Sequence, residues 1–238
     1  MIHVSETLSI HSVEHFLTHD ETEELNDLMD AAICVHGRQR FDADRRTTIH
    51  EIPGYSPAKA QRVYEPAGRV EMTTLPQPAS KILDVAIERQ MPAIVRALPS
   101  VTGHRPWIFL EYGPGQHITA HADGIAPDPL SLPRQIAAAS VSLDTPRTGG
   151  GFYVETTGNE AMWTSERPPG GSGYEPSMQF IHDGADMSSP WFRSMPRTRW
   201  SVDPGPGTLL VFGSQLAHGT EHVQTGCVRK FLTLLIAE

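Results

Sequence analysis

The sequence predicts a mainly β fold with supporting helices, and the different character of its two halves leads to this prediction. From residue 104 onward, short apolar runs alternate with Gly and Pro, which is typical of antiparallel strands joined by turns. Before that point, apolar residues recur at spacings of three and four, which is typical of amphipathic helices. The chain has 238 residues. We expect one domain over residues 1–238, with helical support at about 12–100 and a β core at about 104–238.

The first predicted helix lies within FLTHDETEELNDLMDAAICVHG, residues 16–37. Asp20 is a suitable N-cap, and Glu23 stands three residues later, where its side chain can bond back to the cap. Gly37 follows the last apolar turn and is expected to end the helix. The apolar stripe predicts that the helix packs against another element.

A second helical segment is ASKILDVAIERQMPAIVRALPS, residues 79–100. Pro92 lies inside its apolar pattern and cannot donate a backbone hydrogen bond, so we expect it to divide the helix in two. Residues 38–77, between the two helical segments, show no clear pattern and are expected to be irregular.

The second half contains six predicted strands and one long insert. The strands are RPWIFLEY, HITAHAD, AAASVSLD, GFYVE, GTLLVF and RKFLTLLIAE. Residues 156–206 are rich in Gly, Pro, Ser and Arg, and an irregular segment of this length is usually a lid over a site or a disordered insertion. Its aromatic residues favour ordered packing: Trp163, Tyr174, Phe180, Trp191 and Trp200.

Composition and charge exclude several classes of protein. A formal net charge of −9 opposes binding to nucleic acid, which depends on clustered Lys and Arg. No apolar run is long enough to span a membrane, and the N-terminus lacks the layout of a signal peptide. Cys34 and Cys227 are far apart in the chain, and we expect reduced thiols rather than a disulfide. The protein is expected to be soluble and cytoplasmic.

One short stretch, YGPGQHITAHAD at residues 112–123, predicts a metal site. His121 and Asp123 are two residues apart, so on a strand they project from the same face. Such a pair also occurs on exposed strands, and a third donor is needed. His218, just after an apolar strand, is the best candidate, and His222 is its competitor. Two histidines and one carboxylate leave other positions open and suit non-haem Fe(II), whereas a structural zinc site needs a fourth ligand.

Arg229 lies on the last predicted strand among apolar residues. A guanidinium at a core-facing position must be paired, and its planar fork matches a carboxylate. The partner can be a ligand carboxylate or an internal Asp or Glu, and an exposed edge position is a third interpretation. Lys230 is next in line as a carboxylate-binding residue.

The order of these motifs resembles that of the Fe(II)/2-oxoglutarate-dependent dioxygenases, in particular the prolyl-hydroxylase-like branch. The resemblance rests on YGPGQHITAHAD, LDTPRTGGGFYV, PGTLLVFGSQLAHG and GCVRKFLTLL, and it covers residues 104–238. It implies a double-stranded β-helix, a cupin-like jelly roll, with the N-terminal helices packed on one side. It also implies Fe(II), the cosubstrate 2-oxoglutarate and O₂, and hydroxylation of an unactivated C–H bond with release of succinate and CO₂.

The resemblance also assigns roles to individual residues. His121, Asp123 and His218 resemble the iron ligands. Arg229 resembles the residue that binds the distal carboxylate of 2-oxoglutarate, with Thr233 on the same face, and Tyr112 resembles a tyrosine that contacts this cosubstrate: these are the expected cosubstrate residues Arg229, Tyr112 and Thr233.

Two departures from the family pattern bear on these roles. Arg229 follows His218 by one residue more than is usual, which implies a bulge near Gly226 or a different residue at the carboxylate. The span between the two histidine ligands is longer than usual, and the insert at 156–206 accounts for the excess. The family's halogenating relatives lack the ligand carboxylate, so Asp123 favours oxygenation.

The sequence leaves the main substrate open. We expect a small molecule, such as an amino acid derivative or a natural-product intermediate, with the insert as a substrate lid. Arg193, Arg197 and Arg199 within this insert predict an anionic group on the substrate, although loop arginines are commonly solvated. The alternatives are a peptidyl, prolyl-type hydroxylase and, from a different class, a jelly-roll protein that binds metal without oxidation.

Overall fold

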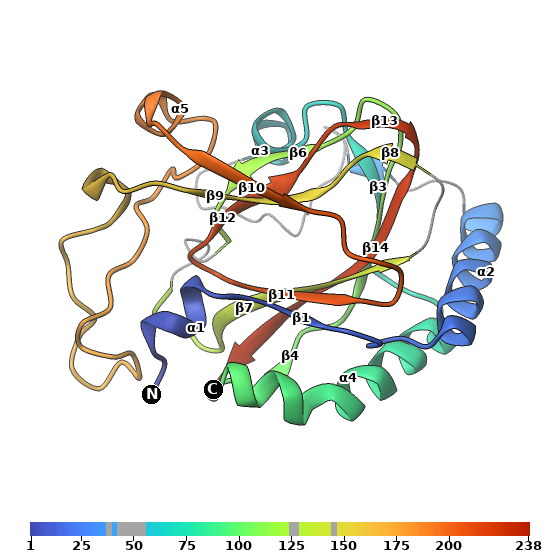
Figure 1. The fold of residues 1–238 in the computed structure, drawn as a ribbon, viewed down its shortest axis with the longest axis horizontal. Helices are drawn as coiled ribbons and strands as arrows, with labels where there is room; N and C mark the ends of the chain where they lie inside the picture. The colour runs from blue at the N-terminus through green and yellow to red at the C-terminus, as the bar shows by residue number, and fades with distance from the viewer. Residues whose placement is uncertain (37–39, 42–55, 124–128, 144–146) are drawn as a thin grey trace.

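The computed structural model describes residues 1–36, 40–41, 56–123, 129–143 and 147–238. Within these ranges two antiparallel sheets face each other, as Figure 1 shows. The major sheet has the strand order β1 (Ile10–Val13), β11 (Leu209–Gly213), β7 (Arg134–Leu143), β14 (Val228–Ala237), β5 (Ile108–Tyr112), β3 (Arg69–Met72) and β2 (Arg40–Phe41), with β4 (Gly103–His104) paired to β14. The minor sheet has the order β10 (Thr198–Val202), β9 (Phe152–Thr156), β12 (Ala217–Thr220) and β6 (Ile118–His121).

A short two-stranded ribbon and several helices complete the described fold. The ribbon pairs β13 (Val223–Gly226) with β8 (Arg147–Gly149). The helices are α1 (Val4–Leu8), α2 (His19–His36), α3 (Pro57–Tyr64), α4 (Gln77–Ala97), α5 (Pro190–Ser194) and the 3₁₀ turn η1 (Glu160–Met162). No helix in the described ranges is both long and apolar enough to cross a membrane.

The space between the two sheets is filled by apolar side chains from both. Phe152 and Val154 of the minor sheet share one buried cluster with Leu210 and Phe212 of the major sheet. These side chains alternate along each strand with residues that point to the outer faces, because strand side chains have a period of two. The interior of the sandwich is therefore lined by every second residue of the central strands.

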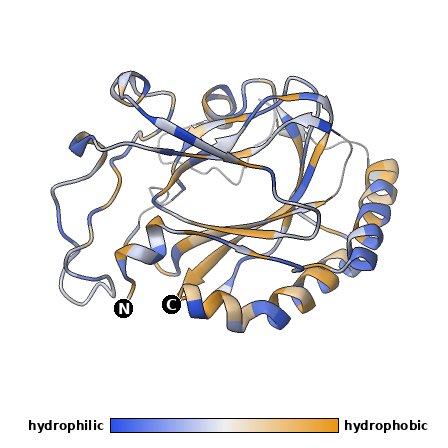
Figure 2. Cartoon of the chain, in the orientation of Figure 1, coloured by the Kyte–Doolittle hydropathy of each residue, from blue (hydrophilic) through white to orange (hydrophobic). Residues whose placement is uncertain are grey.

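The outer face of the major sheet is covered by α2 and α4. Leu83 and Ile87 of α4 and Leu25 of α2 are fully buried in one cluster with Phe109 of β5 and Phe231 of β14. Full burial of each such side chain contributes about 1.5–3 kcal/mol. Figure 2 shows hydrophobic and hydrophilic residues alternating along both helices, as expected for helices that cover a sheet.

Two local expectations for this first half need correction, and a third lies outside the described residues. The N-cap of α2 is Thr18: its hydroxyl accepts the Glu21 amide at 3.2 Å, and Glu21 Oε2 accepts the Thr18 amide at 2.8 Å. Asp20 therefore lies inside the first turn and is not the cap, while the expected terminator Gly37 lies outside the described residues. Pro92 does not divide α4, which runs unbroken through it.

The segment expected to be irregular, residues 38–77, contains α3 and β3. Ser56 caps α3 by accepting the Lys59 amide at 3.2 Å, and the helix has Pro at its first turn. A serine followed by proline is a known signal for the start of a helix. Because the segment lacks a long apolar pattern, this signal alone did not lead to a predicted helix. The two elements matter because their residues reach the candidate site.

The described residues of the insert that follows β9, residues 156–206, form ordered structure. Met162, Ile181 and Phe192 of the insert pack with Tyr153 and Ala120 on the outer face of the minor sheet. Farther along, the insert pairs with the N-terminal segment, as shown by the amide of Ile2 bonded to the Gly173 carbonyl at 2.8 Å. Its last part, within the range expected to be irregular, forms β10.

Candidate metal centre

His121 and His218 are brought together by the pairing of β6 with β12. Their Cα atoms are direct partners in this antiparallel pair, so both side chains project into the space between the sheets. Asp123 follows β6 and completes the group. Its Oδ1 lies 3.4 Å from His121 Nε2 and its Oδ2 lies 3.8 Å from His218 Nε2.

The three donor atoms all lie within 4.8 Å of one another, and this is the group of metal-binding side chains found in the described part of the chain. Both histidines are nearly buried, with exposed fractions of 2% for His121 and 7% for His218. Around a first-row divalent ion with bond lengths of about 2.1 Å, neighbouring donors are about 3 Å apart. The group can hold such an ion if its donors, now within 4.8 Å of one another, move closer together.

Both imidazoles are oriented for metal binding by backbone carbonyls. His121 Nδ1 donates to the Thr119 carbonyl at 2.8 Å, and His218 Nδ1 donates to the Leu216 carbonyl at 3.0 Å. A carbonyl only accepts, so each Nε2 carries the lone pair that a metal needs. Burial lowers the pKa of His218 to about 4, with Asp123 opposing the shift, so this ring is neutral at pH 7. The donor set therefore fits Fe(II).

The wall behind His218 is aromatic. The ring of Phe212 lies 4.5 Å from the imidazole centroid and that of Phe152 lies 5.8 Å away. These two rings restrict the imidazole and exclude water from the side of the site that faces the interior of the sandwich.

His222, the competing candidate ligand, lies elsewhere. Its ring stacks on that of His117, with centroids 3.7 Å apart. It does not belong to the group formed by His121, Asp123 and His218. The pairing of β12 with β6 therefore favours His218 over His222 as the third member of the group.

The structure does not bring Arg229 or Thr233 to this group. Both lie on the face of β14 that is covered by helices, together with Phe231. Arg229 Nε donates to Glu111 Oε2 at 2.8 Å, and its Nη2 donates to Asp30 Oδ1 at 2.7 Å. The guanidinium thus pairs with internal acids, the alternative that its sequence context had left open.

Thr233 is likewise engaged away from the metal group, since its hydroxyl donates to the Arg105 carbonyl. The expected bulge has a counterpart in β13, whose register against β8 shifts between Val223 and Thr225. Gly226 ends β13 with a φ of 74°, a conformation that favours glycine, and Arg229 lies on the outer face of the sheet three residues later.

Lys230 occupies the inner face instead. Its ammonium donates to the hydroxyl of Thr220 at 2.9 Å and lies 5.2 Å from the centroid of the Tyr112 ring. Burial, together with Arg69 and Arg147, lowers the pKa of Lys230 to about 7, while Asp123 opposes the shift. The amine therefore changes its charge near pH 7, and it lies within the electrostatic reach of the Asp123 carboxylate.

Tyr112 lies beside Lys230, but its hydroxyl already has two partners. It donates to Glu65 Oε1 at 3.0 Å and accepts from Arg69 Nη1 at 3.0 Å. Arg69 also pairs with Glu71, and all three charged side chains are at most 1% exposed. The tyrosine therefore offers its ring rather than its hydroxyl to a neighbouring ligand.

The arginines of the insert also have partners within the chain. Arg193 donates to the carbonyls of Met187 and Ser188, at 2.8 and 3.0 Å. Arg197 and Arg199 both pair with Glu155, at 2.6 and 2.8 Å. Arg199 lies over the Tyr153 ring, on the outer face of the minor sheet, opposite to the metal group. These positions give no support to the expected contact with an anionic substrate.

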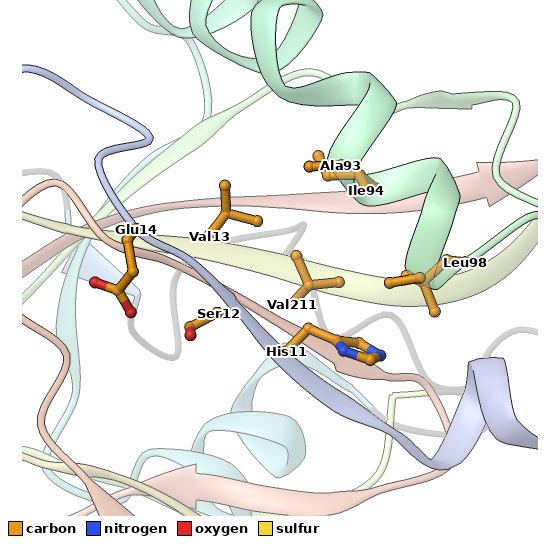
Figure 3. Close-up of a pocket in the computed structure, with 9 residues that line it drawn as sticks. His11, Ser12, Val13, Glu14, Ala93, Ile94, Leu98 and Val211 are labelled. Atoms are coloured by element: carbon orange, nitrogen blue, oxygen red, sulfur yellow. The ribbon is translucent and has the colours of Figure 1, made fainter.

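A separate pocket of about 300 Å³ lies between β1 and α4 (Figure 3). It is on the helix-covered side of the major sheet, because Val211 in its wall packs with α4, whereas Leu210 and Phe212 point between the sheets. Two of its polar side chains are bonded within the chain: the His11 ring to Ser9 at 2.9 Å, and Glu14, which accepts from the Thr208 hydroxyl at 3.3 Å. We assign no ligand to it.

Comparison with known proteins shows which fold the chain has. No protein-family model matches the chain, and no curated protein gives a significant match. Among solved structures, a prolyl-4-hydroxylase from Pseudomonas putida matches 98% of this chain and 94% of its own, with a TM-score of 0.56 and 16% identity. The chain has the fold of that enzyme.

Two further structures show how broad this fold is. A prolyl hydroxylase from Trichoplax adhaerens, in complex with a hypoxia-inducible-factor peptide fragment, has a TM-score of 0.57 and 12% identity, covering 96% of this chain and 84% of its own. SnoK, a non-haem α-ketoglutarate-dependent carbocyclase from nogalamycin biosynthesis, has a TM-score of 0.55 and 12% identity, covering 96% and 80%. The predicted jelly roll with helices on one side is confirmed.

Proposed function

We propose that this protein is an Fe(II)- and 2-oxoglutarate-dependent oxygenase. The observation that carries the proposal is the preset group of His121, Asp123 and His218, whose Nε2 and carboxylate atoms converge between the sheets. Two imidazoles and one carboxylate on one side of Fe(II) leave positions for a bidentate cosubstrate and O₂. When bound, the iron and 2-oxoglutarate supply the oxidising chemistry that acts on a C–H bond of the substrate.

For the distal carboxylate of 2-oxoglutarate we propose Lys230 and Thr220 in place of Arg229 and Thr233. Lys230 and Thr220 are hydrogen-bonded to each other on the inner surface of the sandwich, at 2.9 Å. An ammonium and a hydroxyl together can bind a carboxylate, and the partly buried position of this pair, with Thr220 buried and Lys230 half-buried, makes the charge interaction stronger than in water. Tyr112 supplies the adjoining ring wall.

The remaining residues of the site orient ligands and exclude water. The carbonyls of Thr119 and Leu216 orient the two imidazoles so that Nδ1 faces the backbone and Nε2 faces the metal position. Phe152 and Phe212 keep the inner side of the centre dry. The chain thereby provides a rigid, water-poor site in which a substrate C–H bond can be placed near the metal.

We propose a small molecule as the main substrate. The metal ligands are nearly buried, and α3 and the insert meet beside His121 through Tyr64 and Asp186, which are each 1% exposed. Such an enclosed surrounding suits a small ligand better than an extended chain. An anionic group is not part of the proposal, because the insert arginines are paired within the protein.

The experiment that tests the proposal is a screen for succinate. The Fe(II)-loaded protein is incubated with 2-oxoglutarate, O₂ and a library of amino acids, their conjugates and proline peptides, with succinate read by mass spectrometry. We expect succinate release that rises with at least one small molecule and is absent in Asp123→Ala. Metal and 2-oxoglutarate binding without any succinate would support a metal-binding jelly-roll protein instead.

A peptidyl hydroxylase is the second candidate. The observation that favours it is the match to the Pseudomonas and Trichoplax prolyl hydroxylases, whose TM-scores are as high as that of the carbocyclase. The fold therefore does not separate the two substrate classes. Succinate release with proline peptides alone would replace the small-molecule proposal with this one.

A further inference from the structure

Three consecutive residues at the end of α3 each contact a different wall of the candidate site. The Val63 carbonyl accepts from the Thr119 hydroxyl of the metal-binding strand at 2.6 Å. Tyr64 reaches the insert, and Glu65 binds the hydroxyl of Tyr112. Figure 1 shows α3 lying along β6, on the side of the minor sheet. The end of this helix therefore joins the metal strand, the insert and the cosubstrate wall.

The contact between Tyr64 and the insert is a hydrogen bond to a buried carboxylate. Tyr64 donates to Asp186 Oδ2 at 2.8 Å, and the amide of Ser188 donates to Asp186 Oδ1 at 2.7 Å. The Tyr64 ring also meets the His121 imidazole edge-on, with centroids 5.0 Å apart. Hydrogen bonds to ionised groups are about twice as strong as neutral ones, so this contact is well suited to hold two segments together.

Asp186 lies directly beside a metal ligand. Its backbone forms an antiparallel bridge with His121, so the two side chains project to the same face. The same face continues through His218 to Val154, since these residues are direct partners in the minor sheet. Asp186 of the insert therefore continues the row of side chains formed by Val154, His218 and His121 across the minor sheet. The hydrogen bond from Tyr64 holds it in that position.

We propose that the Tyr64–Asp186 hydrogen bond is a latch that holds the insert against α3 beside the metal, and that both residues position the main substrate. The inference rests on the proposed function, since it takes His121 as a metal ligand. The latch is local: it fixes residues 181–189 next to the site without supplying a metal ligand. Loss of the bond releases this part of the insert, and the substrate loses a wall while the metal and cosubstrate keep theirs.

Hydrogen exchange of the protein loaded with Fe(II) and 2-oxoglutarate under anaerobic conditions tests the latch. Tyr64→Phe keeps the ring against His121 and removes only the donor, and Asp186→Ala removes the acceptor. We expect exchange in residues 181–189 to become about tenfold faster in both variants, because a buried charge-assisted bond is lost. Asp186→Asn keeps a hydrogen-bond acceptor for Tyr64, so residues 181–189 should keep most of the wild-type protection from exchange.

The matched control is Tyr174→Phe, which removes another hydroxyl of the insert, the one that donates to the Pro129 carbonyl at 2.6 Å. It should leave exchange in residues 181–189 unchanged. The affinity for Fe(II) should change less than threefold in Tyr64→Phe. With any small molecule found in the succinate screen, its KM should rise at least fivefold while the KM for 2-oxoglutarate stays the same.

Several outcomes would overturn the latch. Unchanged exchange in residues 181–189 of Tyr64→Phe and Asp186→Ala would show that other contacts hold the insert. Loss of Fe(II) affinity in Tyr64→Phe by tenfold or more would place this tyrosine in the support of the metal centre instead. If the wild type bound neither Fe(II) nor 2-oxoglutarate, the proposed function would fail, and exchange in the metal-free proteins would still decide on the latch.

Discussion

Arg229 and Lys230 are neighbours on β14 whose side chains point to opposite faces of the major sheet. Arg229 pairs with Glu111 and Asp30 on the helix-covered face, whereas Lys230 bonds to Thr220 on the face that carries the metal group. We therefore expect the two cations to differ in role, Arg229 in stability and Lys230 in the binding of the cosubstrate.

Lys230→Met should weaken 2-oxoglutarate binding on the order of a hundredfold, since loss of one partner of a buried charge pair costs about 2–4 kcal/mol. Calorimetric titration of the Fe(II) protein under anaerobic conditions measures this change. Lys230→Arg should retain more of the affinity than Lys230→Met because it keeps the charge. Equal 2-oxoglutarate affinity in wild type and Lys230→Met would remove Lys230 from the cosubstrate site.

Arg229→Leu should act on stability instead. It leaves Glu111, a buried acid, without its guanidinium partner, and we expect unfolding to become easier by about 3 kcal/mol. Chemical denaturation gives the change in the free energy of unfolding. The affinity of the folded fraction for 2-oxoglutarate should stay within threefold of wild type, and a large loss of that affinity would return the cosubstrate role to Arg229.

The sequence was sufficient to predict a mainly β fold with supporting helices and the strand that carries His121, because these depend on local periodicity, and it paired His121 with Asp123 because they are two residues apart on a strand. The jelly roll was implied by the resemblance of the motif order to a known family. His218, preferred to His222 in the sequence, is the histidine that the structure brings to this pair, but its strand β12 was not predicted. The sequence was not sufficient to assign Arg229 and Lys230 to faces. A shift of one position exchanges the two faces of a strand, and irregularities just before β14, such as the register shift in β13, cannot be read from the sequence pattern.

The support of the site was harder to predict. Tyr64, Glu65 and Arg69 lie in a segment without a long apolar pattern, and each acts through a partner that is distant in the sequence. The start of α3 at Ser56 and Pro57 was the available signal. Tertiary pairing, rather than local propensity, determines which face of a short helix is buried, so the contacts of α3 required the structure.

Binding of 2-oxoglutarate should depend on pH through Lys230. The pKa of this amine is lowered from 10.5 to about 7. A dianionic ligand favours the protonated amine, so the affinity should be highest below pH 7 and fall by up to about tenfold per pH unit above it. Calorimetry of the wild type between pH 6 and pH 9 measures this slope on both sides of the Lys230 pKa.

The control for this pH dependence is Lys230→Arg, whose guanidinium stays protonated over the whole range, so its 2-oxoglutarate affinity should be nearly flat. The pH dependence of folding stability has the opposite sign to that of 2-oxoglutarate binding. Between about pH 7 and 10.5 the folded chain holds fewer protons at this residue than the unfolded chain, so its contribution to stability rises with pH. A flat profile in the wild type would contradict the assignment of the carboxylate to Lys230.

Removal of single ligands should separate the metal group from its competitor. His121→Ala, Asp123→Ala and His218→Ala should each lose bound Fe(II) while the circular dichroism spectrum is kept, because a site with three protein donors cannot spare one. His222→Ala serves as the control, since it removes only a ring stacked on His117. Metal content after anaerobic loading and desalting provides the measurement. Loss of iron in His222→Ala with retention in His218→Ala would reverse the assignment.

Arg69 should be essential for stability, because it is the cation between two buried carboxylates. Its guanidinium pairs with Glu65 and Glu71, which are both fully buried. Arg69→Met leaves these acids without a cation and should destabilise the fold by about 3–5 kcal/mol, which corresponds to a decrease in Tm of about 10 °C. Arg89→Met is the matched control: Arg89 pairs with Glu21 at the surface, 2.9 Å away, and its loss should cost no more than about 1 kcal/mol. Differential scanning calorimetry compares the two variants, and equal Tm values would show that the buried group tolerates the loss of its charge.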